Sequence, residues 1–256
     1  MMLDKNRVIP KDKRNMVLVM INIFLGTLSV YMAVSKHTLE AIILVFLVSA
    51  IDAINWYSIE KDKDEYGVYL HSMSDIVSYC IAPSMMIMFT FMAPVTSTLT
   101  EHIKNLSVVI ATIIVLFAGV GNLLRFSSGR YKDKMFHGLP TSVNAMLVCL
   151  ITLLFYYGLV DYNYLPVGML AIIVSSILVI ADVEYVKFTT IKSGTLVSCL
   201  VLMYSLFIVM SLVGVILSNR LVFEIFTSLS LIYIVVYILF GAIIPIYLCD
   251  EENNGG

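Results

Sequence analysis

Apolar and polar residues alternate in long blocks along the chain, and the apolar blocks determine its organisation. Eight apolar stretches approach or exceed the length that an α-helix needs to cross the roughly 30 Å hydrocarbon core of a bilayer. They comprise residues 16–34, 39–57, 67–92, 106–124, 142–159, 167–181, 195–217 and 222–248, the sixth being the shortest. The predicted fold class is therefore all-α, a polytopic integral membrane protein of about eight transmembrane helices.

Composition agrees with this pattern and limits the number of domains. The chain has 256 residues, of which 60% are hydrophobic and 13% charged, whereas soluble domains carry about 25% charged residues. We therefore expect one transmembrane domain over residues 16–249 and no separate soluble domain. A basic cytoplasmic segment, residues 1–15, precedes it, and a short acidic tail, residues 250–256, is expected to be disordered.

Lysine and arginine residues predict the orientation in the membrane. If the eight stretches all cross the bilayer, the N-terminal tail and alternate loops hold 13 of these residues, and the other side holds three. Cytoplasmic loops carry the excess of Lys and Arg, so both termini should face the cytoplasm, in the cytoplasmic membrane. The net charge of -2 gives no indication of nucleic-acid binding.

Four polar side chains interrupt the second and third apolar stretches, within residues 51–83. Asp52 and Asn55 are three residues apart, and His71 and Asp75 are four apart, so each pair shares a helix face. The hinge between the two stretches, residues 58–66, is short enough to make them antiparallel neighbours. The four side chains should therefore converge on a cytoplasm-facing polar cavity, and ionisable groups within apolar spans indicate a functional site.

Further polar groups fall on the same predicted side of the membrane. Arg125 ends the fourth stretch, the segment FHGLP at residues 136–140 precedes the fifth, and Asp182 and Glu184 follow the sixth. A transporter would place such groups near the bilayer midplane. Their position at one surface favours chemistry on a polar substrate that is attached to a lipid.

Residues 52–75 resemble the signature of the CDP-alcohol phosphatidyltransferases, D-x2-D-G-x2-A-R-x8-G-x3-D-x3-D. The flanking segments are similar to the phosphatidylserine synthase branch, which includes archaetidylserine synthases. DIVSYCIAP at residues 75–83 resembles that branch's D-x-V-S-F-G-x-A-P, and GNLLRFS at residues 121–127 resembles its G-R-L-A-R-F-N. FHGLP resembles its F-x-G-L-P. The resemblance covers residues 51–188, where the motifs share their order and spacing.

The resemblance implies transfer of a phosphatidyl or archaetidyl group from a CDP-activated lipid to the hydroxyl of serine, with release of CMP, in phospholipid biosynthesis. It implies a divalent cation, Mg²⁺ or Mn²⁺, and Asp75 as the general base. The expected partners are the CDP-lipid, serine and the bilayer, and a homodimer is left open. The implied metal ligands are Asp52, Asn55, His71 and Asp75, and the implied substrate or phosphate contacts are Glu60, Gly67 and Arg125.

Several positions depart from the family pattern and leave enzymatic activity open. Asn55 and His71 replace two aspartates, Trp56 replaces a glycine, and Glu60 replaces an arginine. The carboxylates at the matching positions thus supply a charge of -2 instead of -4, and Glu60 repels a diphosphate. We expect little standard activity. A catalytically inactive relative that binds lipid or acts as a scaffold is the alternative, and a transporter is a third.

Simpler roles are also open for some of these side chains. His71 can be a buried histidine with satisfied hydrogen bonds, and Asn55 can be an interhelical hydrogen-bonding group. Arg125 can be an interfacial anchor. Glu60 lies in a charged run that is typical of a solvated loop.

Overall fold

The computed structural model describes residues 13–62, 65–93, 98–128, 135–186, 206, 208–211, 213–214, 217 and 219–240. Its helices are α1 (Lys13–Val34), α2 (Thr38–Asp62), α3 (Glu65–Asp75), α4 (Ala82–Phe91), α5 (Leu99–Ser127), α6 (Thr141–Tyr156), α7 (Leu165–Ile180) and α9 (Arg220–Phe240). The π-helical turn η1 (Ile76–Ile81) joins α3 to α4, and the 3₁₀ turn η3 (Tyr162–Tyr164) precedes α7. Two short strands, β1 (Met135–His137) and β2 (Glu184–Val186), complete the described elements.

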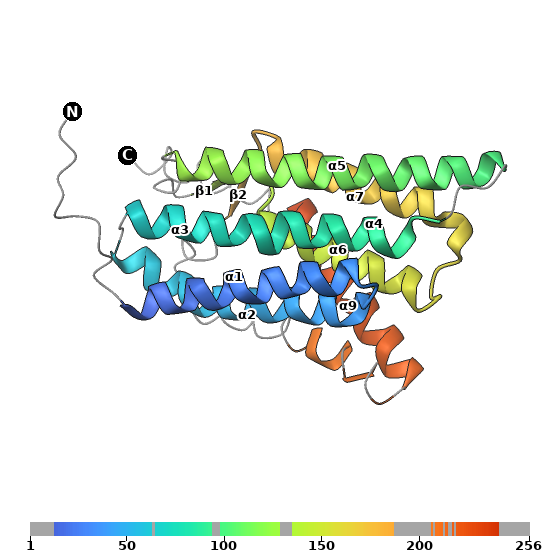
Figure 1. Cartoon of the computed structure of the whole chain (residues 1–256), viewed down its shortest axis with the longest axis horizontal. Coiled ribbons are helices and arrows are strands. Elements are labelled where there is room, and N and C mark those ends of the chain that lie inside the picture. Colours follow the sequence, from blue (N-terminus) through green and yellow to red (C-terminus); the bar gives the residue numbers. More distant parts are fainter. Residues whose placement is uncertain are drawn as a thin grey trace, which may run out of the picture.

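The helices form an elongated bundle in which α1, α2, α5, α7 and the continuous α3–η1–α4 rod run lengthwise beside one another (Figure 1). α6 lies within the bundle and packs on α7, α4 and α2, while α9 packs against α6. The main apolar core is formed where α1, α2, α4, α5 and α6 meet. The bundle therefore holds the second and third predicted spans side by side, as the short hinge requires.

Five helical segments in the described part of the chain are long and apolar enough to cross a membrane. They are Met16–Val34, Tyr69–Phe91, Leu99–Ser127, Tyr162–Ile180 and Arg220–Phe240. α2 has 25 residues and coincides with the second predicted span, and α6 is a shorter apolar helix. These helices support an all-α membrane protein. Most of the predicted seventh span and the tail at residues 250–256 lie outside the described residues, so the count of eight stays a prediction.

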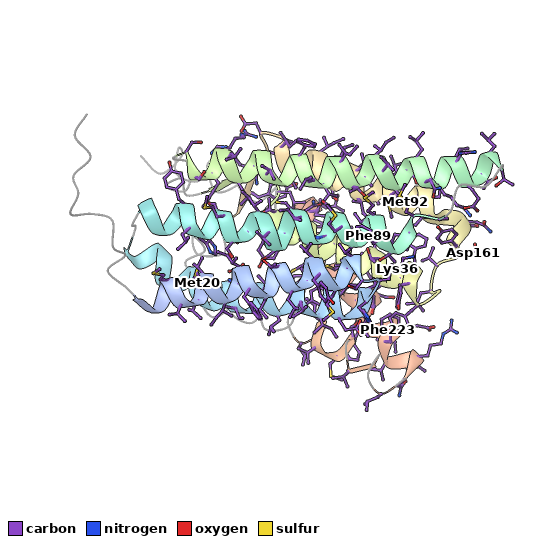
Figure 2. All side chains as sticks on the ribbon, viewed as in Figure 1. Met20, Lys36, Phe89, Met92, Asp161 and Phe223 are labelled. Atoms are coloured by element: carbon purple, nitrogen blue, oxygen red, sulfur yellow. The ribbon has the colours of Figure 1, made fainter. Side chains whose placement is uncertain are left out.

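The outer faces of the bundle are apolar, as a lipid environment requires. On α5 the exposed side chains recur at intervals of three, four or seven residues, which gives a single stripe along the helix. α1 likewise exposes Met20 and Phe24, and Figure 2 shows side chains projecting outward from both helices. The α5 stripe comprises Leu106, Ile110, Ile113, Phe117 and Leu124.

The π-helical turn follows from the proline that lies just beyond it. Pro83 has no backbone N–H, and its ring disfavours a regular helical bond to the carbonyl four residues earlier. Ala82 accordingly donates its backbone N–H to the carbonyl of Val77, five residues back. Single π turns of this kind are frequent at functional sites. Here the turn buries three consecutive residues, Ser78, Tyr79 and Cys80.

Two glycines allow the neighbouring helices to approach the π turn closely. A Cβ on Gly26 of α1 would lie 2.3 Å from Ser78 Oγ, and one on Gly119 of α5 would lie 2.4 Å from Cys80 Sγ. Small residues at helix contacts are the usual means of close packing within a bilayer. The turn is thus held between α1 and α5, which fixes the depth of the residues on either side.

A two-stranded antiparallel ribbon was not predicted from the sequence. β1 pairs with β2, with Phe136 opposite Tyr185. Gly138 follows β1 with a φ of +89°, and a Cβ there would lie 2.1 Å from the carbonyl oxygen of Val179. Only glycine fits this combination of conformation and space. The FHGLP segment therefore ties the start of α6 to the end of α7, with Leu139 fully buried.

Candidate metal centre

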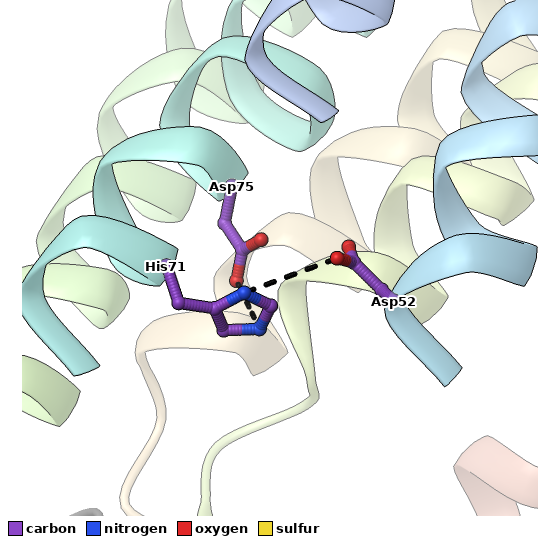
Figure 3. A group of neighbouring side chains, drawn as sticks. All are labelled: Asp52, His71 and Asp75. Carbon is purple, nitrogen blue, oxygen red and sulfur yellow. Dashed lines mark ion pairs between the residues drawn. The ribbon is translucent and has the colours of Figure 1, made fainter. Parts of the chain in front are cut away.

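Asp52, His71 and Asp75 come together from two neighbouring helices (Figure 3). Asp52 lies on α2, and His71 and Asp75 lie one turn apart on α3. Asp52 Oδ1 is 3.9 Å from His71 Nδ1, and His71 Nε2 is 3.7 Å from Asp75 Oδ2. One ligand atom from each residue lies within 4.8 Å of the other two. The helical spacing and the short hinge predicted this convergence.

Two residues that the sequence analysis missed each donate a hydrogen bond to one oxygen of the Asp52 carboxylate. Asn22 of α1 donates its Nδ2–H to Asp52 Oδ1. Tyr79 of the π turn donates its hydroxyl to Asp52 Oδ2 at 2.5 Å. Such outer partners orient a ligating carboxylate and tune its affinity. An asparagine within the first apolar span was the one signal that could have pointed to Asn22.

The cluster is nearly closed to solvent, and some of its polar atoms have no hydrogen-bond partner. The side chains of Asp52 and Asp75 are 13% exposed, and that of His71 is 7% exposed. Asp75 Oδ1 and Asn22 Oδ1 are buried without a hydrogen-bond partner. Buried polar atoms are nearly always satisfied, so such exceptions require an explanation. Two carboxylates, an imidazole and unpaired oxygens are a donor set that fits a divalent cation.

Three of the predicted site residues lie on the helices that carry the cluster, but their side chains are outside the described part of the structure. Asn55 and Glu60 belong to α2, and Gly67 belongs to α3. The same holds for Trp56, which follows Asn55 on α2. Their roles as ligands or substrate contacts therefore stay predictions.

Arg125 joins a second polar group at the end of α7. Its Nη1 donates to the carbonyl oxygen of Ile180 at 2.6 Å, and its Nη2 lies 3.3 Å from Asp182 Oδ1. His137 Nδ1 lies 3.4 Å from the same carboxylate oxygen. These contacts link α5 to the ribbon and to the end of α7. They account for part of the hydrogen-bonding capacity of Arg125, since a guanidinium carries five N–H donors.

Comparison with known proteins gives three similar curated relatives, while no family model matches the chain. Archaetidylserine synthase of Methanothermobacter thermautotrophicus is 26% identical over 180 residues, which cover 69% of this chain and 70% of the relative. CDP-diacylglycerol–serine O-phosphatidyltransferase of Methanocaldococcus jannaschii is 29% identical over 171 residues, 66% of this chain and 71% of the relative. The Helicobacter pylori protein of the same name is 25% identical over 188 residues, 72% and 76%.

The described part of the chain is a bundle of long apolar helices with a buried acidic cluster, which supports a membrane protein. The chain is related to the CDP-alcohol phosphatidyltransferases, and within them to the phosphatidylserine synthase-like branch. This confirms the resemblance seen in the motifs.

Proposed function

We propose that the chain is a phosphatidylserine synthase-like membrane protein that holds one divalent cation at Asp52, His71 and Asp75. The observation that supports the proposal is the convergence of these three side chains, which lie on α2 and α3 and are nearly closed to solvent. In the parent reaction a CDP-lipid and serine give a phosphatidyl- or archaetidylserine and CMP. The names of the relatives support these substrates.

A bound cation would neutralise the diphosphate of the CDP-lipid and the charge on the departing CMP. The remaining roles belong to the chain itself. Asp75 is the proposed general base, because its Oδ1 has no hydrogen-bond partner while its Oδ2 faces His71. Its Oδ1 would accept the proton of the acceptor hydroxyl. Arg125 is a proposed phosphate contact through the N–H groups that Ile180 and Asp182 leave open, and Glu60 and Gly67 would border the nucleotide.

The composition of the cluster argues for slow turnover with Mg²⁺. Its two carboxylates supply a charge of -2, and the third group is an imidazole, which suits Mn²⁺ or Zn²⁺ better than Mg²⁺. Glu60 in place of an arginine removes an attraction for phosphate. Two like charges about 4 Å apart repel by roughly 4 kcal/mol at an effective dielectric of 20, which is an upper figure for Glu60 against a diphosphate. We propose that standard activity is therefore low.

The second candidate is a catalytically inactive relative that binds lipid or a partner subunit. It is favoured by the fact that Asn55, Trp56 and Glu60 all depart from the family pattern while the flanking motifs persist. In either case the cluster is proposed to face the cytoplasm, with both chain termini on that side of the cytoplasmic membrane.

Release of CMP from a CDP-lipid in the presence of serine separates the two candidates. The purified protein is assayed with Mg²⁺ and with Mn²⁺, beside Asp75→Asn. We expect turnover that is slow with Mg²⁺, faster with Mn²⁺ and abolished in Asp75→Asn. No CMP release with either metal would favour the inactive relative. Fast Mg²⁺-dependent turnover that vanishes in Asp75→Asn would show that the altered motif is a fully working site.

A further inference from the structure

Asn22 lies on α1, a helix outside the signature that packs beside α3, and it reaches the cluster from there. Its side chain is fully buried, and its Nδ2 donates to Asp52 Oδ1. Its backbone carbonyl accepts a bond from Ser78 Oγ at 3.4 Å. Gly26, one turn further along α1, permits this approach to the π turn. Packing thus holds the Asn22 amide beside the Asp52 carboxylate.

The oxygen of the Asn22 side-chain amide, in contrast to its nitrogen, is left without a hydrogen bond. Asn22 Oδ1 is buried and makes no hydrogen bond. Two other buried asparagines in the bundle behave differently. Asn144 of α6 donates to Ser176 Oγ and accepts from Ser175 Oγ, and Asn105 of α5 binds both the N–H and the carbonyl of Ala93. A buried acceptor without a partner costs about 1–3 kcal/mol, so the unpaired oxygen of Asn22 points to a ligand.

We propose that Asn22 belongs to the cation site, with its Nδ2 fixing the Asp52 carboxylate and its Oδ1 supplying a further oxygen ligand. This rests on the proposed function, in which Asp52, His71 and Asp75 hold a divalent cation. Amide oxygens are ordinary ligands of hard cations. The ligand set then consists of three oxygen-bearing side chains and one imidazole, drawn from three helices.

If Asn22 is a ligand, α1 contributes to the cation site as well as to the helix bundle. A cation that touches Asn22, Asp52 and Asp75 connects α1, α2 and α3 at one point. Binding of the cation should therefore stabilise the contact between α1 and the other two helices. An Asn22 that only fills space would give no such coupling between metal and stability.

Mn²⁺ binding to the full chain in lipid nanodiscs tests this inference directly, with free Mn²⁺ followed by electron paramagnetic resonance. The variants are Asn22→Leu, Asn22→Asp and the matched control Asn144→Leu, which removes a buried amide away from the cluster. We expect Asn22→Leu to bind Mn²⁺ at least about tenfold more weakly, by analogy with the loss of other groups around metal sites. Asn144→Leu should keep the wild-type affinity.

Asn22→Asp gives a second measurement that does not depend on the folding of Asn22→Leu. The substitution adds a second carboxylate beside Asp52. The two negative charges repel each other and destabilise the metal-free protein until a cation is bound. We expect Mn²⁺ to raise the melting temperature of Asn22→Asp by more than it raises that of the wild type.

The outcomes distinguish this inference from the proposed function. If the wild type binds Mn²⁺ and both Asn22 variants respond to it like the wild type, Asn22 is not a ligand and the inference is overturned, while the cation site stands. If the wild type binds no Mn²⁺ at millimolar concentration, the proposed function itself fails, and this inference fails with it.

Discussion

Two groups of buried polar side chains, at different positions along the bundle, have their hydrogen bonds satisfied to different degrees. Far from the acidic cluster, where α5 begins, Lys104 Nζ lies 3.5 Å from Glu101 Oε1, 3.4 Å from Asn163 Oδ1 and 4.5 Å from the centre of the Tyr162 ring. Asn105 beside it makes two bonds to the backbone of Ala93. At the cluster, in contrast, oxygens of two side chains have no hydrogen-bond partner.

We propose that the difference separates a structural polar group from a binding site. Near Lys104 each polar side chain meets partners from neighbouring segments, which joins the start of α5 to the end of α4 and to the turn before α7. Such a network needs no ligand. At Asp52, His71 and Asp75, two carboxylates and one imidazole share a nearly closed space. We propose that a divalent cation balances these two carboxylates, since buried charges in proteins are usually paired or coordinate metals.

The largest change in stability is expected near the start of α5, where the buried polar side chains have hydrogen-bond partners. Asn105→Leu keeps the volume but leaves the N–H and carbonyl of Ala93 without their side-chain partner. We expect a loss of about 1–3 kcal/mol in stability and no change in Mn²⁺ affinity. Thermal unfolding in nanodiscs and the Mn²⁺ titration measure the two quantities. Ser107→Ala, which removes only a bond to the carbonyl of Lys104 within α5, is the control. Weakened Mn²⁺ binding in Asn105→Leu would contradict the view that the polar group around Asn105 is independent of the acidic cluster.

A change of metal preference is expected when the imidazole of the cluster is replaced by the family's carboxylate. His71→Asp brings the charge of the cluster to -3, which favours the hard cation Mg²⁺. We expect about a tenfold gain in Mg²⁺ affinity, which is about 1.4 kcal/mol, with lower stability when no metal is present. His37→Asp, on the exposed turn between α1 and α2, is the control. An unchanged Mg²⁺ response in His71→Asp would contradict a metal role for residue 71.

The smallest effect concerns the packing that positions the site. Gly119→Ala would place a methyl group against Cys80 Sγ and should push α5 away from the π turn, which we expect to destabilise the protein by about 1–2 kcal/mol. Gly121→Ala, two residues further on α5, has nothing within 4 Å of its Cβ. Because alanine favours a helix over glycine, Gly121→Ala should be neutral or slightly stabilising. Equal melting temperatures for the two variants would refute the packing argument.

Local spacing was enough to predict the core of the site. Asp52, His71 and Asp75 could be brought together from the sequence because helix periodicity fixes each face and a short hinge fixes the pairing of α2 with the rod that begins with α3. The apolar stretches likewise gave the bounds of α1 and α5 to within a few residues at most ends, and to within seven at the start of α5.

Features that depend on packing across the chain were not predictable in this way. Asn22 lies 30 residues before Asp52, and its contact depends on how closely α1 approaches the π turn. Tyr79 reaches the same carboxylate through that turn, whose occurrence the sequence signals only by Pro83. The ribbon escaped prediction because strands of three residues are too short to show a period of two.

Binding of Mn²⁺ to the wild type and to Asp75→Asn tests the central claim, that Asp52, His71 and Asp75 form a divalent-cation site. Asp75→Asn is nearly isosteric, so its melting temperature without metal is expected to equal or exceed that of the wild type. The account predicts one Mn²⁺ per wild-type chain and an affinity lower by about 100-fold in Asp75→Asn. Equal affinity of the two proteins, or no binding by the wild type at millimolar Mn²⁺, would contradict it.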